Sequence, residues 1–139
     1  MKIEDAITIA TEAHRGQQDK GGQPYILHPL RLMLAAANHD ERIVALLHDV
    51  IEDSDWTLDE LLARGLSARQ ADALDAVTRR NDEGYDAFIR RAGADPLGRA
   101  VKILDLQDNS DLSRIAAPGE VDHARIEKYR RALALLLSS

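Results

Sequence analysis

The chain has 139 residues, which is enough for one domain with its own hydrophobic core. Hydrophobic residues make up 45% of it and charged residues 30%, a balance typical of soluble globular proteins. The net charge of −6 argues against nonspecific nucleic-acid binding, and the absence of cysteine excludes disulfides, thiolate zinc sites and a cysteine nucleophile. The sequence shows neither an apolar run of the ~18 residues that a membrane span needs nor a signal-peptide layout, so we expect a cytoplasmic protein.

Helical periodicity and capping signals predict an all-α fold of about eight short helices. Strand signals are nearly absent, because aromatic residues total only 4% and alternating β-branched runs are missing. In chain order, the predicted helices begin near Ile3, Pro29, Asp40, Thr57, Ser67, Tyr85, Pro96 and Val121. Asp40 is the expected cap of the third helix, which continues to Asp53. Residues 1–139 are therefore predicted to form a single helical domain.

The third predicted helix carries four titratable residues directly after its most apolar stretch. His48 and Glu52 are four residues apart, and so are Asp49 and Asp53, so each pair shares one side of a helix. Apolar neighbours indicate that part of this cluster points inward, where charge is costly unless it is paired or bound to a metal. A bound cation is the simplest compensation. The alternative is a solvated helix end, although acids there oppose the helix dipole.

A second polar cluster lies on the seventh predicted helix, and a histidine lies at the entrance of the second. Asp105 and Asn109 share a side of the helix, and Lys102 lies one turn before Asp105. His28 precedes a proline, which fixes it at a helix entrance. Taken singly, His28 has an ordinary capping explanation and Asp105 an ordinary ion pair with Lys102. Together, two histidines and two aspartates make a nitrogen and oxygen set suited to Mn²⁺, Fe²⁺ or Zn²⁺.

Five features in fixed order carry a resemblance to a known family: HRGQ at 14–17, Lys20, PYILHP at 24–29, ALLHDVIED at 45–53 and VKILDLQDN at 101–109. They resemble the HD-domain metal-dependent phosphohydrolases, and most closely the hydrolase domain of RelA/SpoT-type enzymes over roughly residues 3–112. The stand-alone small alarmone hydrolases are particularly similar. Such enzymes remove the 3′-pyrophosphate from guanosine tetra- and pentaphosphate.

The resemblance implies a role for each polar cluster. It implies one Mn²⁺ bound by four residues: His28, His48, Asp49 and Asp105. It implies that Glu52 and Asp53 align and deprotonate the attacking water. It also places Asn109 near the ribose and Lys20 beside the nucleotide. Cations must offset the net charge around a polyanionic substrate, and the candidates are Lys20, Arg79, Arg80, Arg90, Arg91 and Lys102. Lys102 is the stronger candidate because it lies one turn before Asp105.

One position departs from the family pattern. Asp19 replaces a basic residue of the first loop, and a carboxylate neither stacks on a base as a guanidinium does nor attracts phosphate. The alternatives are therefore a hydrolase of another phosphorylated nucleotide, such as NADPH, or a catalytically silent sensor that binds metal or nucleotide. The Glu52–Asp53 pair favours catalysis over sensing. The apolar stretch 132–137 belongs either to the core, which we favour, or to a subunit contact, and the oligomeric state stays open.

Overall fold

The computed structural model describes residues 1–138, and their regular structure is helical. The elements are α1 (Ile3–His14), α2 (Leu27–Ala35), α3 (His39–Leu47), α4 (Val50–Asp53), α5 (Leu58–Ala63), α6 (Ala68–Val77), α7 (Tyr85–Ala94), α8 (Pro96–Asn109), the 3₁₀ helix η1 (Leu112–Arg114) and α9 (Glu120–Ser138). Within residues 1–138, extended pairing is limited to one bridge between Gln18 and Pro24. The all-α prediction is confirmed.

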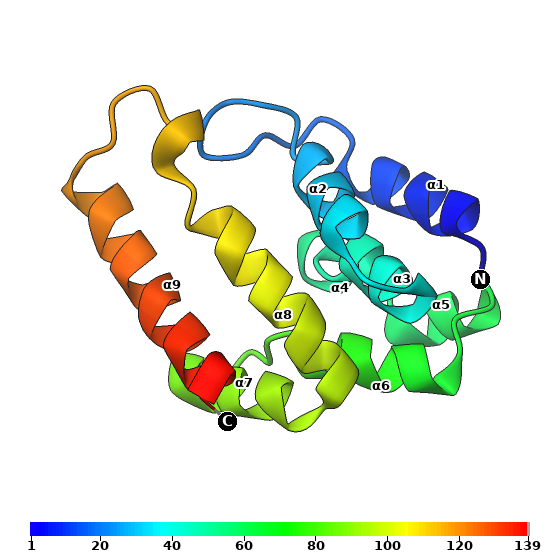
Figure 1. The fold of residues 1–139 in the computed structure, drawn as a ribbon. Coiled ribbons are helices and arrows are strands. Elements are labelled where there is room, and N and C mark those ends of the chain that lie inside the picture. The colour runs from blue at the N-terminus through cyan, green and yellow to red at the C-terminus, as the bar shows by residue number, and fades with distance from the viewer. Residues whose placement is uncertain (139) are drawn as a thin grey trace.

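Helix α3 is the centre of the main core. It packs against α1, α2, α6 and α8, and residues 43–47 are fully buried. In Figure 1, α8 runs through the middle of the molecule, with α9 on one side and α2 and α3 on the other. Helix α8 therefore carries its side chains into both halves of the fold. A smaller core joins α7, α8 and α9 through Phe88, Ile89, Leu106, Ala132 and Leu136.

The capping signals of the sequence place several helix starts correctly. The Thr57 hydroxyl accepts the N–H of Glu60 at 3.2 Å, and the Glu60 carboxylate accepts the N–H of Thr57 at 3.1 Å. This is a capping box, which satisfies two free N–H groups at the start of α5. Ser67 and Gln70 make the same pair of bonds at the start of α6. At α8, Asp95 caps the helix and Pro96 takes its first position.

The predicted third helix is wrong in two respects. Its cap is Asn38, whose side chain accepts the N–H of Glu41 at 3.0 Å, whereas Asp40 accepts a hydrogen bond from Gln70 at 2.9 Å. The helix also breaks after Leu47, and α4 starts at Val50. At the break, the His48 ring donates a hydrogen bond to the carbonyl of Ala45 at 2.7 Å. A carbonyl that binds a side chain competes with the helical ladder, so the chain turns at His48 and Asp49.

The C-terminal apolar stretch is buried along one side of α9. Ala132 and Leu136 are 5% and 2% exposed, whereas Leu135 and Leu137 are 42% and 60% exposed. The core assignment therefore holds for the side that packs against α7 and α8.

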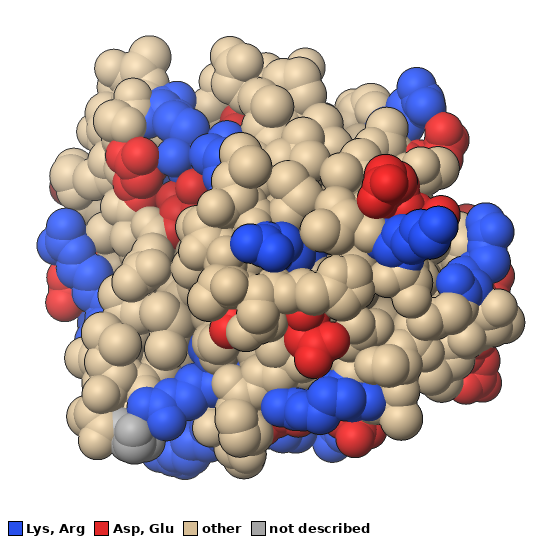
Figure 2. Space-filling view, turned by 45° about the vertical axis from the view of Figure 1, so that its right-hand side comes forward, with Lys and Arg blue, Asp and Glu red and all other residues tan. Residues whose placement is uncertain are grey.

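No helix in residues 1–138 combines the length and apolarity of a membrane span. On the face drawn in Figure 2, basic and acidic side chains lie interspersed rather than in one basic stretch.

Candidate functional site

The four predicted metal ligands meet where α2, the α3–α4 break and α8 come together. His28 Nε2 lies 3.1 Å from His48 Nε2 and 2.9 Å from Asp105 Oδ1. His48 Nε2 lies 3.0 Å from Asp49 Oδ2 and 3.4 Å from Asp105 Oδ1. Atoms that bind one metal ion at about 2.0–2.2 Å lie about 3 Å apart, as the atoms of these four pairs do. Both imidazoles are almost completely buried, at 3% and 2% exposure.

The hydrogen bonds on the far side of each imidazole test whether a metal ion fits. His48 Nδ1 donates to the Ala45 carbonyl, and His28 Nδ1 donates to Asp108 at 2.6 Å. A neutral imidazole bonded in this way leaves a bare lone pair on Nε2. Two such lone pairs and two carboxylate oxygens would lie close together in a largely buried space, where a positive charge between them offsets their repulsion. The donor set therefore fits a divalent cation.

The electrostatics of His48 point the same way. Burial lowers the pKa of His48, but the charges of Asp49 and Asp105 outweigh burial and raise the pKa well above its usual value. The space between these groups therefore stabilises added positive charge, whether it is carried by a proton or by a metal ion.

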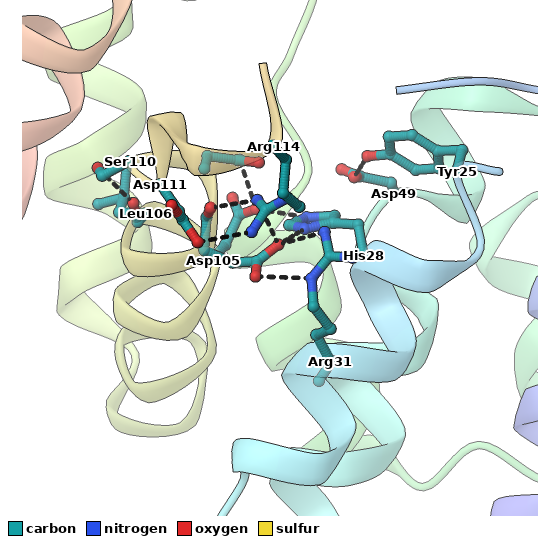
Figure 3. Close-up of polar contacts among 12 residues, drawn as sticks. Tyr25, His28, Arg31, Asp49, Asp105, Leu106, Ser110, Asp111 and Arg114 are labelled. Atoms are coloured by element: carbon teal, nitrogen blue, oxygen red, sulfur yellow. Dashed lines mark hydrogen bonds and ion pairs between the residues drawn. The ribbon is translucent and has the colours of Figure 1, made fainter. Parts of the chain in front are cut away.

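A second set of side chains holds the ligands in place. Arg31 donates to both oxygens of Asp108, at 2.8 and 2.9 Å, and so orients the carboxylate that fixes His28. Figure 3 shows His28, Arg31 and Arg114 pointing toward one another, with the Tyr25 hydroxyl paired to Asp49. Burial raises the pKa of Asp108, but His28 and Arg31 outweigh burial and lower the pKa, so this carboxylate stays charged. Such outer partners orient metal ligands and tune their basicity.

Asp105 is held by two more predicted site residues. Lys102 Nζ donates to Asp105 Oδ2 at 2.8 Å, and Asn109 Nδ2 donates to Asp105 Oδ1 at 2.9 Å. Both side chains also line a cavity of about 310 Å³ beside the ligands, together with Glu52 and Asp53. The structure thus brings three predicted groups to one place: the candidate metal ligands, the two carboxylates expected to activate water, and two of the three predicted substrate-binding residues.

Glu52 and Asp53 line this cavity and are exposed to solvent. The Glu52 Oε1 atom accepts the backbone N–H of Arg79 at 2.6 Å. Partial loss of water around each carboxylate is the main cause that raises the pKa of Glu52 and of Asp53, and the charge of Asp49 raises both further. A carboxylate with a raised pKa is a better proton acceptor near neutral pH than an ordinary surface acid.

A larger cavity of about 710 Å³ adjoins the first, with Tyr25, Asp53, Asn109 and Tyr129 lining both. Its volume lies in the range of small-molecule sites. Lys20 lines it from the loop between α1 and α2. Three further cations line it that the sequence analysis did not name, and these are Arg31, Arg114 and Arg125.

Asp19 has a structural task in the loop at the mouth of the larger cavity. Its Oδ1 atom accepts the N–H groups of Gly21 and Gln23, each at 2.9 Å. Its backbone also bonds Gln23 and Gly22. The carboxylate is therefore used by the loop itself and supports Lys20 in the cavity wall. The side chain does not supply the stacking surface that a guanidinium would offer a base at this position.

The remaining predicted cations divide into two groups. Arg79 lines the smaller cavity. Arg80 and Arg90 are exposed and line neither cavity, and Arg91 binds the Glu83 carboxylate and the carbonyl of Thr78. None of these three arginines lines either cavity. Sequence reasoning assigned no role to six side chains that do, namely Tyr25, Arg31, Asp108, Arg114, Arg125 and Lys128.

Comparisons with known proteins add relatives and one solved structure. No family model matches the chain. It is 33% identical over 138 residues to human guanosine-3′,5′-bis(diphosphate) 3′-pyrophosphohydrolase MESH1, which covers 90% of this chain and 76% of the relative. It is 35% identical over 120 residues to the protein of Aquifex aeolicus with the same enzyme name, covering 78% of this chain and 17% of the relative.

The structural comparison matches the fold over almost the whole chain. The matched structure is described as a metazoan ortholog of SpoT that hydrolyzes ppGpp and plays a role in starvation responses. The TM-score is 0.77 with 18% identity, covering 97% of this chain and 84% of that one. By contrast, the chain spans less than a fifth of the length of several curated relatives that it matches.

Proposed function

The chain belongs to the family of the HD-type guanosine-3′,5′-bis(diphosphate) 3′-pyrophosphohydrolases, and from this starting point we propose that it removes the 3′-pyrophosphate of guanosine tetra- and pentaphosphate. The observation that carries the proposal is the approach of two imidazoles and two aspartates, beside the exposed carboxylates of Glu52 and Asp53. The names of the relatives support the substrate class.

We propose that one divalent ion, Mn²⁺, is held by His28, His48, Asp49 and Asp105. Ligand atoms of the first three all lie within 4.8 Å of one another, and Asp105 Oδ1 lies 2.9 Å from His28 Nε2. When bound, such an ion lowers the pKa of a water ligand and neutralises charge on a phosphoryl oxygen. Mn²⁺ agrees with the mixed imidazole and carboxylate set, which other divalent transition metals also accept.

Glu52 and Asp53 would take the proton from the attacking water. The N–H of Arg79 holds Glu52 Oε1, so Oε2 is the oxygen available to accept a proton. The backbone carbonyl of Asp53 accepts a hydrogen bond from Gln17 at 3.0 Å, which ties Asp53 to the loop at the larger cavity. Adjacent carboxylates titrate together, so the pair is assigned the role as a unit.

The two adjoining cavities would set the orientation of the bound substrate. The larger one would hold the nucleoside and its 5′-phosphates near Lys20, Arg114 and Arg125. Asn109, which lines both cavities, would lie near the ribose at their junction. The 3′-pyrophosphate would then reach into the smaller cavity beside the metal ligands.

Asp19 favours a second candidate substrate. Without a guanidinium at this position the loop lacks one stacking surface for guanine, and a different phosphorylated nucleotide such as NADPH then becomes a candidate.

A catalytically silent sensor has less support, because binding alone does not need the Glu52–Asp53 pair. A cytoplasmic location stays part of the proposal.

The test measures phosphate and pyrophosphate release by metal-stripped protein supplied with Mn²⁺. The substrates are guanosine tetraphosphate, NADPH and common nucleoside di- and triphosphates. Pyrophosphate released from guanosine tetraphosphate alone supports the proposal. Release only from another nucleotide retains the metal chemistry and replaces the substrate. Absence of release with Mn²⁺ bound supports the sensor.

A further inference from the structure

Three basic side chains line the smaller cavity. Lys102, Lys128 and Arg79 line it, from α8, α9 and the segment after α6. Lys128 Nζ lies 3.9 Å from the centre of the Tyr85 ring, and the Arg79 guanidinium carbon lies 5.7 Å from the same centre. Two cations thus gather around one aromatic ring in the cavity wall.

Two of these three cations have no carboxylate partner within residues 1–138. Lys102 is paired with Asp105, but Lys128 makes no ion pair within residues 1–138. The Arg79 guanidinium donates to the backbone carbonyl of Glu83 at 3.1 Å rather than to a carboxylate. Burial lowers the pKa of Lys128, and the charges of Arg79 and Lys102 lower it further, which reflects crowded positive charge.

The same wall contains an unused polar group. The Tyr85 hydroxyl is buried and has no hydrogen-bond partner within residues 1–138. A buried hydroxyl without a partner is costly, and a bound polar group would remove that cost. Two unneutralised cations and a spare hydroxyl make an environment suited to an anion rich in oxygen atoms.

The acidic groups of the site line the same cavity, and these are Asp49, Glu52, Asp53 and Asp105. Lys102 contacts Asp105 and the Arg79 N–H contacts Glu52, so acids and cations meet in its wall. A phosphate beside the candidate metal ligands therefore lies in the same cavity of about 310 Å³ as Lys128 and Arg79. A second phosphate joined to the first would contact these two cations, whereas a lone phosphate at the ligands would leave them without an anion.

We infer that Lys128, with Arg79 and Tyr85, forms a subsite for the distal phosphate of a 3′-pyrophosphate group. This inference rests on the proposed function. It adds that the enzyme recognises the distal phosphate of its substrate. In the reaction, the water oxygen bonds to the phosphorus attached to the ribose. The bond from that phosphorus to the ribose 3′-oxygen breaks, and the 3′-oxygen takes a proton. The distal phosphate stays at the subsite and leaves as part of pyrophosphate.

The first test compares guanosine tetraphosphate with guanosine 5′-diphosphate 3′-monophosphate, which differ only in the distal phosphate. In Lys128→Gln, kcat/KM for the tetraphosphate should fall about ten- to a hundredfold, as expected for a lost charged hydrogen bond. The value for the monophosphate should change less than about twofold. Arg130→Gln is the matched control, because Arg130 lies on the same helix, is exposed and lines neither cavity. Lys128→Arg should restore much of the lost rate.

The second test does not depend on turnover. Calorimetry on Mn²⁺-loaded protein measures binding of inorganic pyrophosphate and of orthophosphate, and circular dichroism checks that each variant is folded. Lys128→Gln should weaken pyrophosphate about tenfold or more and leave orthophosphate unchanged. Unchanged pyrophosphate binding, or equal losses for both anions, would overturn the subsite. If the wild type binds pyrophosphate through Lys128 but does not hydrolyse the tetraphosphate, the proposed function fails and the subsite stands.

Discussion

His48 and Asp49 are neighbours in the chain, yet His48 Nε2 lies 3.0 Å from Asp49 Oδ2. In a continuous helix, consecutive side chains point about 100° apart and do not meet. Here α3 ends at Leu47 and α4 starts at Val50; His48 keeps regular helical angles, whereas Asp49 departs from them, with a φ of −106° and a ψ of 0°. This local departure from a regular helix accompanies the approach of the two side chains to one point.

Asp105→Asn should weaken Mn²⁺ binding by at least about tenfold, because it removes one anionic ligand. Asparagine has nearly the same size and shape as aspartate, so the substitution leaves no empty space beside Lys102. Calorimetric titration of metal-stripped protein measures the effect, with Asp86→Asn, an exposed acid, as the control. Full stoichiometry and wild-type affinity in Asp105→Asn would remove Asp105 from the ligand set.

Asp108→Asn should also weaken Mn²⁺ binding, by about ten- to a hundredfold, although Asp108 is not a ligand. The carboxylate holds His28 Nδ1–H at 2.6 Å and so leaves Nε2 free to bind a metal. Arg31→Gln should have a smaller effect in the same direction, because it only orients Asp108. An affinity equal to that of the wild type in Asp108→Asn would show that the tautomer of His28 is fixed by other means.

Glu52→Gln should keep metal binding and lose turnover by about a hundredfold or more, since an amide cannot accept the proton from water. The amide oxygen still accepts the Arg79 N–H, so the loop should keep its position. Single-turnover rates at saturating substrate, together with a metal titration, separate the two effects. Wild-type turnover in Glu52→Gln would leave Asp53 as the sole base.

In the metal-free protein, Glu52 and Asp53 should titrate above the ordinary range of carboxylates. The pKa of Glu52 and the pKa of Asp53 are both raised, mainly by loss of water around them, and the charge of Asp49 raises both further. NMR titration of the carboxyl carbons in metal-stripped protein checks this. Carboxyl pKa values of about 4 or below for both residues would contradict it.

The Glu83–Arg91 pair should stabilise the fold at neutral pH and lose that effect in acid. Arg91, through its hydrogen bonds, lowers the pKa of Glu83 from 4.5 to about 2. Because the folded pKa is depressed, the stabilisation is present above about pH 4.5 and is lost as the pH falls toward 2. Urea unfolding of wild type and Glu83→Gln should therefore differ more at pH 6.5 than at pH 3.5. A difference that does not depend on pH would assign the effect to packing.

The features of the fold and the site that depend on local residue spacing could be predicted from the sequence. Helical periodicity and capping boxes located most helix starts, and the i,i+4 pairs located the ligand clusters. The break at His48 was not predictable in this way, because it depends on a side-chain bond to Ala45 and on packing around α3. Asn38 was missed as a cap because Asp40 is an equally good capping residue by type.

The outer partners were missed for a different physical reason. Arg31 and Asp108 are separated by 77 residues and meet only because α2 packs against α8. Their spacing offered a signal, since each lies three residues after a predicted ligand. Lys128 and Arg125 offered none, because only the packing of α9 against α8 brings them to the cavities.

One metal ion, held by residues from three parts of the chain, is expected to support hydrolysis of the 3′-pyrophosphate. The most direct measurement is pyrophosphate release from guanosine tetraphosphate by metal-stripped protein titrated with Mn²⁺. We predict no release without metal, a rise that saturates at one ion per chain, and at least about tenfold weaker activation in Asp105→Asn. Full release from the stripped protein, or identical titrations for wild type and Asp105→Asn, would contradict the account.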